Sequence, residues 1–102
     1  MRIIKPSRVR EFQVAHPRAA TSLSRWLEPV ESHEWKSLQE LRRVFPNADG
    51  VTVESGRTVT VFNITGNAYR LITAIHYNTG ILYVMLFMTH AEYDKHSWKD
   101  HL

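Results

Sequence analysis

The sequence has no cysteine among its 102 residues, so disulfide bonds, thiolate zinc sites and a thiol nucleophile are excluded. It also lacks a long hydrophobic run. The longest, ILYVMLFM at 81–88, is far shorter than the roughly 20 residues that cross a bilayer. The start, MRIIKPSRVR, has no apolar stretch of the kind that signal peptides carry. These absences predict a cytoplasmic protein with no membrane partner.

Basic side chains are only slightly more numerous than acidic ones. Thirteen Lys and Arg against ten Asp and Glu give a net charge of +3, which permits a polyanionic partner without requiring one. Residues 1–26 are more one-sided, because they hold six basic side chains and only one acidic one. This basic third is either a solvated helix surface or a surface for an anionic partner. Length and an apolar content of 43% fit a single domain over 1–102.

The N-terminal half has helical periodicity. A short strand, RIIK, precedes Pro6, which suits the first turn of a helix because its missing N–H has no helical partner there. Apolar residues then recur three or four positions apart, and Ser37 with Glu40 has the capping-box pattern of a further helix. The expected apolar faces are Val9, Phe12 and His16; Ala20, Leu23, Leu27 and Val30; and Leu38, Leu41, Val44 and Phe45.

The C-terminal half changes to a period of two. Three β-branched and aromatic runs, 57–64, 68–77 and 81–88, are separated by TGN and NTG turns. Asn63 and Asn67 in FNITGN are interpreted as turn residues. Helices followed by a meander predict the α+β class. We expect a short N-terminal strand and two to three helices packed on one face of a small antiparallel sheet.

The second hairpin can be predicted in more detail. The NTG turn suits a three-residue loop with Gly80 in the left-handed conformation, and paired residue numbers then add to 158. This register places Arg70 opposite Met88 and puts His90 on the same face as Arg70. A two-residue loop would put His90 on the other face. The position of the glycine favours the three-residue loop.

Chemistry-bearing side chains follow the last predicted strand, in the stretch FMTHAEYDKH at 87–96. An apolar strand ends there, and histidine, tyrosine, carboxylate and lysine side chains follow within a few residues. One explanation is that a strand leaves the core and polar residues follow it. The other is that the stretch forms the rim of an active site, together with the arginine of the neighbouring strand.

Arg70, His90, Tyr93, Asp94 and Lys95 are the types of side chain that phosphodiester cleavage uses. A guanidinium can hold a phosphate oxygen by two hydrogen bonds. His90 can take a proton from a ribose 2′-hydroxyl near neutral pH. Tyr93 can do so only if Arg70 and Lys95 lower its pKa, and Asp94 can orient an imidazole. No histidine pair has zinc-ligand spacing, so we expect neither a metal nor a cofactor.

Two long blocks, RTVTVFNITGNAYRLITAIHYN and FMTHAEYDK, resemble the HigB-type toxins of bacterial type II toxin–antitoxin modules, within the RelE-like superfamily. The N-terminal layout agrees, from the strand RII to EWKSLQELRRVFPNAD, so the resemblance covers essentially the whole chain. It implies a RelE-like fold and a metal-independent endoribonuclease, an mRNA interferase that cleaves messenger RNA on the ribosome. It also implies that a HigA-type helix-turn-helix antitoxin neutralises the protein.

The resemblance also implies roles for single residues. Arg70 in YRL matches the phosphate-binding arginine. His90 and Tyr93 in THAEYDK match the acid/base end of the last strand, and Asp94 and Lys95 lie in the same block. These five residues are the catalytic candidates.

Further positions bear on RNA affinity. Lys36, in the Trp-Lys-Ser stretch, and Arg57, which opens a strand, are the RNA-binding candidates. Two departures from the family reduce the number of cations. Ala68 stands where many relatives have a basic residue before YRL, and Met85 or Leu86 stands where many have an arginine. An attenuated toxin is one consequence that these departures allow.

Two other classes of function remain open from the sequence. One is a non-catalytic module that binds RNA or the ribosome and blocks translation by occupancy. The other is an inert structural partner in a complex.

Overall fold

The computed structural model describes residues 1–102. A five-stranded sheet lies at its centre, in the order β1–β5–β4–β3–β2. The strands are β1 (Arg2–Ile4), β2 (Asp49–Thr52), β3 (Thr58–Ile64), β4 (Tyr69–His76) and β5 (Ile81–Thr89). The helices are α1 (Ser7–Ala15), α2 (Ala20–Ser32), α3 (Leu38–Leu41) and α4 (His90–Asp94), with short 3-10 helices η1 (Pro17–Ala19) and η2 (Ser97–His101).

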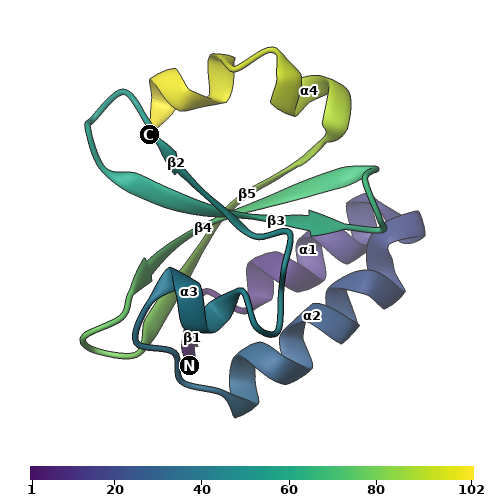
Figure 1. Ribbon diagram of the computed structural model, residues 1–102. Coiled ribbons are helices and arrows are strands. Elements are labelled where there is room, and N and C mark those ends of the chain that lie inside the picture. Colours follow the sequence, from purple (N-terminus) through teal and green to yellow (C-terminus); the bar gives the residue numbers. More distant parts are fainter.

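Different parts of the chain cover the two faces of the sheet (Figure 1). On one face, Leu23 and Trp26 of α2 pack with Phe62 of β3 in the larger core cluster, to which α1 and α3 also contribute. On the other face, Trp98 of η2 packs with Met88 of β5 in a smaller cluster. The C-terminal segment, yellow in Figure 1, therefore lies across the sheet from α1 and α2. The larger core closes one face, and the second face stays partly open.

The predicted α+β class, with a short N-terminal strand and helices on one face, is confirmed. The sheet, however, is mixed and not purely antiparallel, because β1 pairs in parallel with β5, with Arg2 opposite Ile81. The chain between these two strands contains all the other strands and three helices. No hairpin fixes the direction of β1, so its local sequence carries no sign of a parallel partner.

The strand β2 was not predicted. It pairs antiparallel with β3, with Gly50 opposite Thr60, and it forms one edge of the sheet. Its sequence, DGVT, begins with two residues that are rare in strands, and so it resembles a turn. Pairing with the strongly β-forming strand beside it outweighs this weak local preference.

The third helix is shorter than predicted. The N-cap of α3 is Ser37, whose hydroxyl accepts from the backbone N–H of Glu40 at 3.3 Å, as the capping pattern indicated. The helix ends at Leu41, so Val44 lies beyond it and is 38% exposed. No helix of the structure has the length and apolar character that crossing a membrane requires.

The β4–β5 hairpin differs from the prediction at its turn. Next to the turn, His76 pairs with Ile81, and paired residue numbers add to 157. The predicted three-residue loop is therefore wrong. Gly80 has the predicted left-handed conformation, with φ of +68°. The error lies in the loop length, which a single glycine does not determine.

A bulge in β5 restores the predicted register at the other end of the hairpin. Thr73 pairs with Val84 but Ile72 pairs with Leu86, so Met85 is an extra residue in β5. Beyond the bulge Arg70 pairs with Met88, as predicted. The bulge thus compensates for the shorter register at the turn and leaves Arg70 on the face that the C-terminal segment partly covers.

Candidate active site at the end of β5

The last strand passes directly into α4 through a capping box encoded by THAE. The Thr89 hydroxyl accepts from the backbone N–H of Glu92 at 3.2 Å, and a Glu92 carboxylate oxygen accepts from the backbone N–H of Thr89 at 3.0 Å. Both hydrogen bonds from Thr89 lower the pKa of Glu92. The bond from the backbone N–H has the larger effect, and the bond from the hydroxyl has the second largest. His90 begins the helix and its N–H donates to the carbonyl of Ala68 at 2.9 Å. The imidazole is therefore held beside β4.

Arg70 is buried, with 8% of its surface exposed, and it is fully hydrogen-bonded at its end. Nη1 donates to the backbone oxygens of Asn67 and Tyr69, each at 3.1 Å. Nη2 donates to Asn67 Oδ1 at 2.5 Å and lies 3.0 Å from His90 Nδ1. The two terminal nitrogens carry four N–H groups, and each group has a partner. Arg70 therefore has only Nε–H free for a ligand in this arrangement.

His90 lies between Arg70 and Asp94. Its Nδ1 faces the guanidinium, and its Nε2 lies 3.1 Å from Asp94 Oδ2. Because a guanidinium can only donate, Nδ1 accepts, and we assign the ring proton to Nε2, which donates to Asp94. The side chains of His90 and Asp94 are 43% and 59% exposed. The predicted adjacency of Arg70 and His90 is confirmed, and Asp94 joins them in what we call the Arg70–His90–Asp94 cluster.

Tyr93 lies under this cluster. Its ring stacks on Trp98, with centroids 5.3 Å apart, and the Arg70 Cζ atom lies 5.4 Å from its centroid. Burial is the main cause that raises the pKa of Tyr93, the Asp49 carboxylate adds to it, and Arg70 offsets part of it. The condition under which Tyr93 could act as the base, a lowered pKa, is therefore not met, although Arg70 does act in that direction. Desolvation and nearby carboxylates outweigh the single guanidinium.

The remaining predicted residues lie outside the cluster. Lys95 is exposed at the C-cap of α4. Lys36 is exposed and lies 3.8 Å from Glu34, whose carboxylate sits where a side chain on Gly80 would be, at the turn end of β5. Arg57 is exposed in the connection between β2 and β3. The structure thus brings neither Lys36 nor Arg57 to His90.

One residue that contacts the cluster was not predicted from the sequence to do so. Asn67 was interpreted as a turn former, yet both its backbone and its side-chain oxygen bind the Arg70 guanidinium. The sequence did contain an indication of this contact, because an asparagine in the turn just before a strand can hydrogen-bond with a nearby residue of that strand. Asn67 therefore fixes the orientation of Arg70 as well as the turn.

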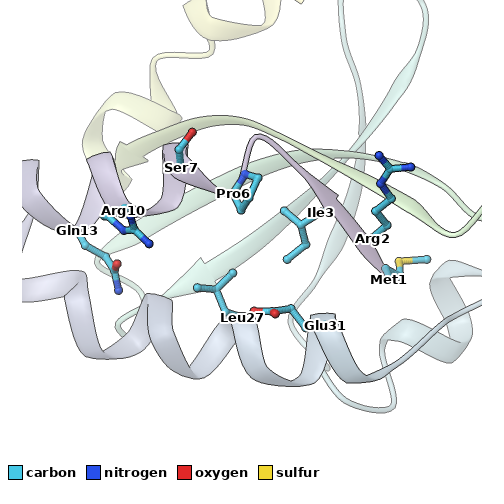
Figure 2. A pocket seen from close by; sticks show the side chains of 9 residues that line it. All are labelled: Met1, Arg2, Ile3, Pro6, Ser7, Arg10, Gln13, Leu27 and Glu31. Carbon is cyan, nitrogen blue, oxygen red and sulfur yellow. The ribbon is translucent and has the colours of Figure 1, made fainter.

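The largest hollow of the molecule lies elsewhere. Figure 2 shows it between β1, α1 and α2, with Arg2, Arg10 and Glu31 among its side chains. Its volume is about 630 Å³. None of its lining residues belongs to the cluster. No group of three or more His, Asp or Glu side chains in the structure is placed to hold a metal ion.

The fold and the cluster together define a small α+β protein whose last strand ends in hydrogen-bonded proton-transfer groups. The chain belongs to the HigB toxin family, the RelE-like toxic component of a toxin–antitoxin system, which matches residues 19–96. The recognition made from the sequence is thereby confirmed. Membership of this family implies an antitoxin as partner.

Named relatives agree with this assignment. The chain is 26% identical over 94 residues to the mRNA interferase toxin HigB of Escherichia coli (strain K12). These aligned residues cover 92% of this chain and 88% of that protein. It is 27% identical over 95 residues to the mRNA interferase HigB of Escherichia coli O6:H1, covering 93% and 90%. An mRNA interferase HigB of Shigella flexneri is 26% identical over 94 residues.

Proposed function

We propose that this protein is an mRNA interferase, a metal-independent endoribonuclease that cleaves messenger RNA at the Arg70–His90–Asp94 cluster. The observation that carries the proposal is the continuous chain of contacts from Arg70 Nη2 to His90 Nδ1, at 3.0 Å, and from His90 Nε2 to Asp94, at 3.1 Å. It joins a cation to a base that is oriented by a carboxylate. The interferase names of the relatives support the same reaction.

Substrate binding begins with an exchange of partners at Arg70. A phosphate oxygen carries more negative charge than a neutral imidazole or an amide oxygen, so it competes well for the Nη2 donors. When the guanidinium turns to the phosphate, it leaves His90 Nδ1. The lone pair that Arg70 had occupied then becomes available, and the bound phosphate itself produces the free base.

His90 then acts as the general base. Nδ1 takes the proton of the ribose 2′-hydroxyl, and the 2′-oxygen forms a bond to the adjacent phosphorus. The imidazolium that results is stabilised by Asp94, to which Nε2–H still donates. Arg70 stabilises the charge that develops on the phosphate oxygens.

A second group protonates the leaving 5′-oxygen as its bond to phosphorus breaks. The products are a 2′,3′-cyclic phosphate and a 5′-hydroxyl. We assign the proton donor as Tyr93, because a phenol is protonated at neutral pH and the centroid of this ring lies 5.4 Å from the Cζ atom of Arg70, which holds the phosphate. Water then returns the proton from His90 to Tyr93. Lys95 is exposed nearby, where its charge attracts the RNA backbone.

The proposal includes the setting of the reaction. Cleavage takes place on ribosome-bound message in the cytoplasm, and a HigA-type helix-turn-helix antitoxin neutralises the toxin. Lys36 and Arg57 contact RNA outside the cluster. The net charge of +3 is compatible with a polyanionic substrate.

Blockade of translation by occupancy is the second candidate function. The observation in its favour is that Arg70 is 8% exposed and that all its terminal N–H groups have partners within the protein. If the guanidinium does not exchange these partners for phosphate, the protein binds RNA without cutting it.

The decisive experiment maps the 5′ ends of cellular mRNA after expression without antitoxin. Cleavage creates new 5′-hydroxyl ends, whereas blockade creates none. We expect growth arrest with new ends in the wild type, and neither in His90→Gln, which keeps a polar side chain but cannot transfer protons near pH 7. New ends of equal abundance in His90→Gln would refute the assignment of the base.

A further inference from the structure

A second concave surface lies on the same sheet face as the cluster. It is a groove of about 510 Å³ at the turn end of β4 and β5, and we call it the basic groove. Arg70 and His76 are an even number of residues apart in β4, so both point to this face. The basic groove is lined by residues that include Lys5, Arg8, Arg57, His76, Tyr83 and Leu86.

The charged side chains of the basic groove are all of one sign, although the C-terminal residue Leu102 also lines it. Lys5, Arg8 and Arg57 line it and no acidic side chain does. The hollow in Figure 2 differs, because Glu31 stands there with Arg2 and Arg10. A concave site that gathers cations without acidic side chains raises the local concentration of polyanions.

The bulge in β5 builds one wall of the basic groove. Met85 is the extra residue, so its carbonyl oxygen is free to accept from Arg8 Nη1, at 2.6 Å. This bond anchors the Arg8 side chain of α1 against the sheet and leaves its other N–H groups without a protein partner. A guanidinium anchored at one nitrogen is oriented in advance for a phosphate at the other.

An aromatic surface lies beside these cations. Tyr83 is 38% exposed, and the His76 ring stands edge-on to it with centroids 5.3 Å apart. Apolar atoms of Ala74 and Leu86 continue the floor of the groove. An exposed ring next to cations is the arrangement that binds unpaired bases, since the base stacks while its phosphates meet the charges.

We propose that the basic groove binds single-stranded message several nucleotides away from the cleaved bond. One base stacks on Tyr83, and Lys5, Arg8 and Arg57 contact the neighbouring phosphates. His76 lies six positions after Arg70 in β4, a length of about 20 Å at roughly 3.3 Å per residue. The RNA strand therefore extends along β5 from the cluster to the turn.

A hollow of about 390 Å³ supplies the path between the two sites. It lies between β5, α4 and η2, shares Leu86 with the basic groove, and reaches Glu92 beside the cluster. The proposal of this RNA site rests on the proposed function, because that function identifies the bound nucleic acid as messenger RNA. It does not depend on cleavage itself.

The test is equilibrium binding of a 2′-O-methyl RNA of about 12 nucleotides, a length in the range that single-strand sites cover. Such RNA lacks the nucleophile and cannot be cut. Tyr83→Ala should weaken binding about tenfold, and Tyr83→Phe, which keeps the ring, should restore it. Arg8→Gln and Arg57→Gln should each weaken binding and lower the salt slope by about 0.7 for the lost phosphate contact.

Arg10→Gln is the matched control, because Arg10 lies on the same helix as Arg8 but lines the hollow of Figure 2. Its affinity should stay close to that of the wild type. Arg57 makes no side-chain hydrogen bond or ion pair, so Arg57→Gln removes charge without disturbing the fold.

Each outcome bears on one proposal. Three outcomes would overturn the proposal that the basic groove binds RNA. They are unchanged affinity in Tyr83→Ala and Arg57→Gln, equal losses of affinity in Arg8→Gln and Arg10→Gln, and no RNA binding by the wild type. Loss of antitoxin binding in these variants with unchanged RNA affinity would overturn it too, and would assign the surface to the antitoxin. Wild-type RNA binding with the predicted losses, but no cleavage of unmodified message on the ribosome, would support the groove and refute the proposed interferase.

Discussion

His90 Nε2 and Asp94 Oδ2 lie 3.1 Å apart within α4, at positions i and i+4. One turn of helix brings such side chains together, so α4 supplies both the imidazole and the carboxylate that orients it. An exposed pair of this kind contributes only about 0–1 kcal/mol to stability. Its effect on the reaction is therefore expected to exceed its effect on folding.

We predict that Asp94→Asn leaves the fold intact and slows cleavage on the order of 10²–10⁴-fold. The amide has nearly the same shape as the carboxylate, but it cannot stabilise an imidazolium by charge, and it can present an NH₂ group to Nε2. Single-turnover cleavage of ribosome-bound message measures the effect. Asp100→Asn is the control, since Asp100 is an exposed carboxylate of η2 that makes no ion pair. Equal rates for Asp94→Asn and Asp100→Asn would contradict the assigned role.

Arg70 variants should separate charge from geometry. Arg70→Ala is expected to slow cleavage on the order of 10²–10³-fold through loss of the phosphate contact. It should also destabilise the fold by about 1–3 kcal/mol, because the carbonyls of Asn67 and Tyr69 lose their donor. Arg70→Lys keeps the charge but cannot make the paired hydrogen bonds, so its rate should stay well below that of the wild type. Urea unfolding and antitoxin binding check that the variants fold. A folded Arg70→Lys variant with the wild-type rate would contradict the phosphate role.

Tyr93→Phe removes the proposed proton donor and keeps the ring that stacks on Trp98. We expect cleavage at least about tenfold slower, with antitoxin binding retained. An RNA whose leaving oxygen is replaced by sulfur needs no protonation of the leaving group. The variant should cleave that substrate at nearly the wild-type rate. A defect of equal size on both substrates would indicate that Tyr93 acts through packing.

The raised pKa of Tyr93 also predicts a dependence of stability on pH. Burial, the main cause, keeps the phenol neutral in the folded state beyond its ordinary pKa of about 10. The contribution is fully present below about pH 10 and is lost as pH rises through the folded pKa. Wild-type stability should therefore fall above about pH 10, and Tyr93→Phe should lose less. Tyr77, whose pKa burial also raises, adds to the same loss, so a Tyr77→Phe background sharpens the comparison. Urea unfolding between pH 8 and about 11 measures it.

The sequence predicted the parts of the site that depend on local pattern. Alternation along 68–77 and 81–88 placed β4 and β5 within a residue at each end, and the two strands put Arg70 and His90 on one face. The predicted register near Arg70 was correct although the predicted turn was not, because the bulge at Met85 compensates for the turn. Nothing in the local sequence marks that bulge, since its carbonyl finds its partner, Arg8, in a helix far away in the chain.

The features that the sequence did not predict depend on distant contacts. β1 pairs in parallel with β5. In the sequence, α1 and α2 separate β1 from all the other strands, so no short turn fixes its direction, and the direction depends on the topology of the whole fold. The pKa of Tyr93 follows from Trp98, which covers its ring, and from Asp49, which belongs to β2. Periodicity and spacing describe neighbours along the chain, whereas desolvation is set by residues far apart in it.

The last prediction concerns the capping box that connects β5 to α4. Thr89→Ala removes the oxygen that accepts from the backbone N–H of Glu92 at 3.2 Å, and it should cost about 0.5–2 kcal/mol of stability. α4 has five residues, so the loss of its cap loosens both His90 and Asp94. Cleavage should therefore fall by about tenfold or more, because misplacement of catalytic groups by about 1 Å can cost 10²-fold. Thr89→Ser restores the hydroxyl and should restore the rate.

The matched control is Ser37→Ala, which removes the cap of α3, where the Ser37 hydroxyl accepts from Glu40 at 3.3 Å. It should cost a similar amount of stability and leave the rate unchanged, because α3 does not contribute to the cluster. The stabilising contribution of Glu92, whose pKa the Thr89 bonds lower, is present above its ordinary pKa of about 4.3 and is lost as pH falls below it. Thr89→Ala should therefore lose less stability than the wild type on acidification. Equal rates in Thr89→Ala and the wild type would mean that α4 holds His90 and Asp94 in place without its cap, and that the contact between Arg70 and His90 alone determines the geometry of the cluster.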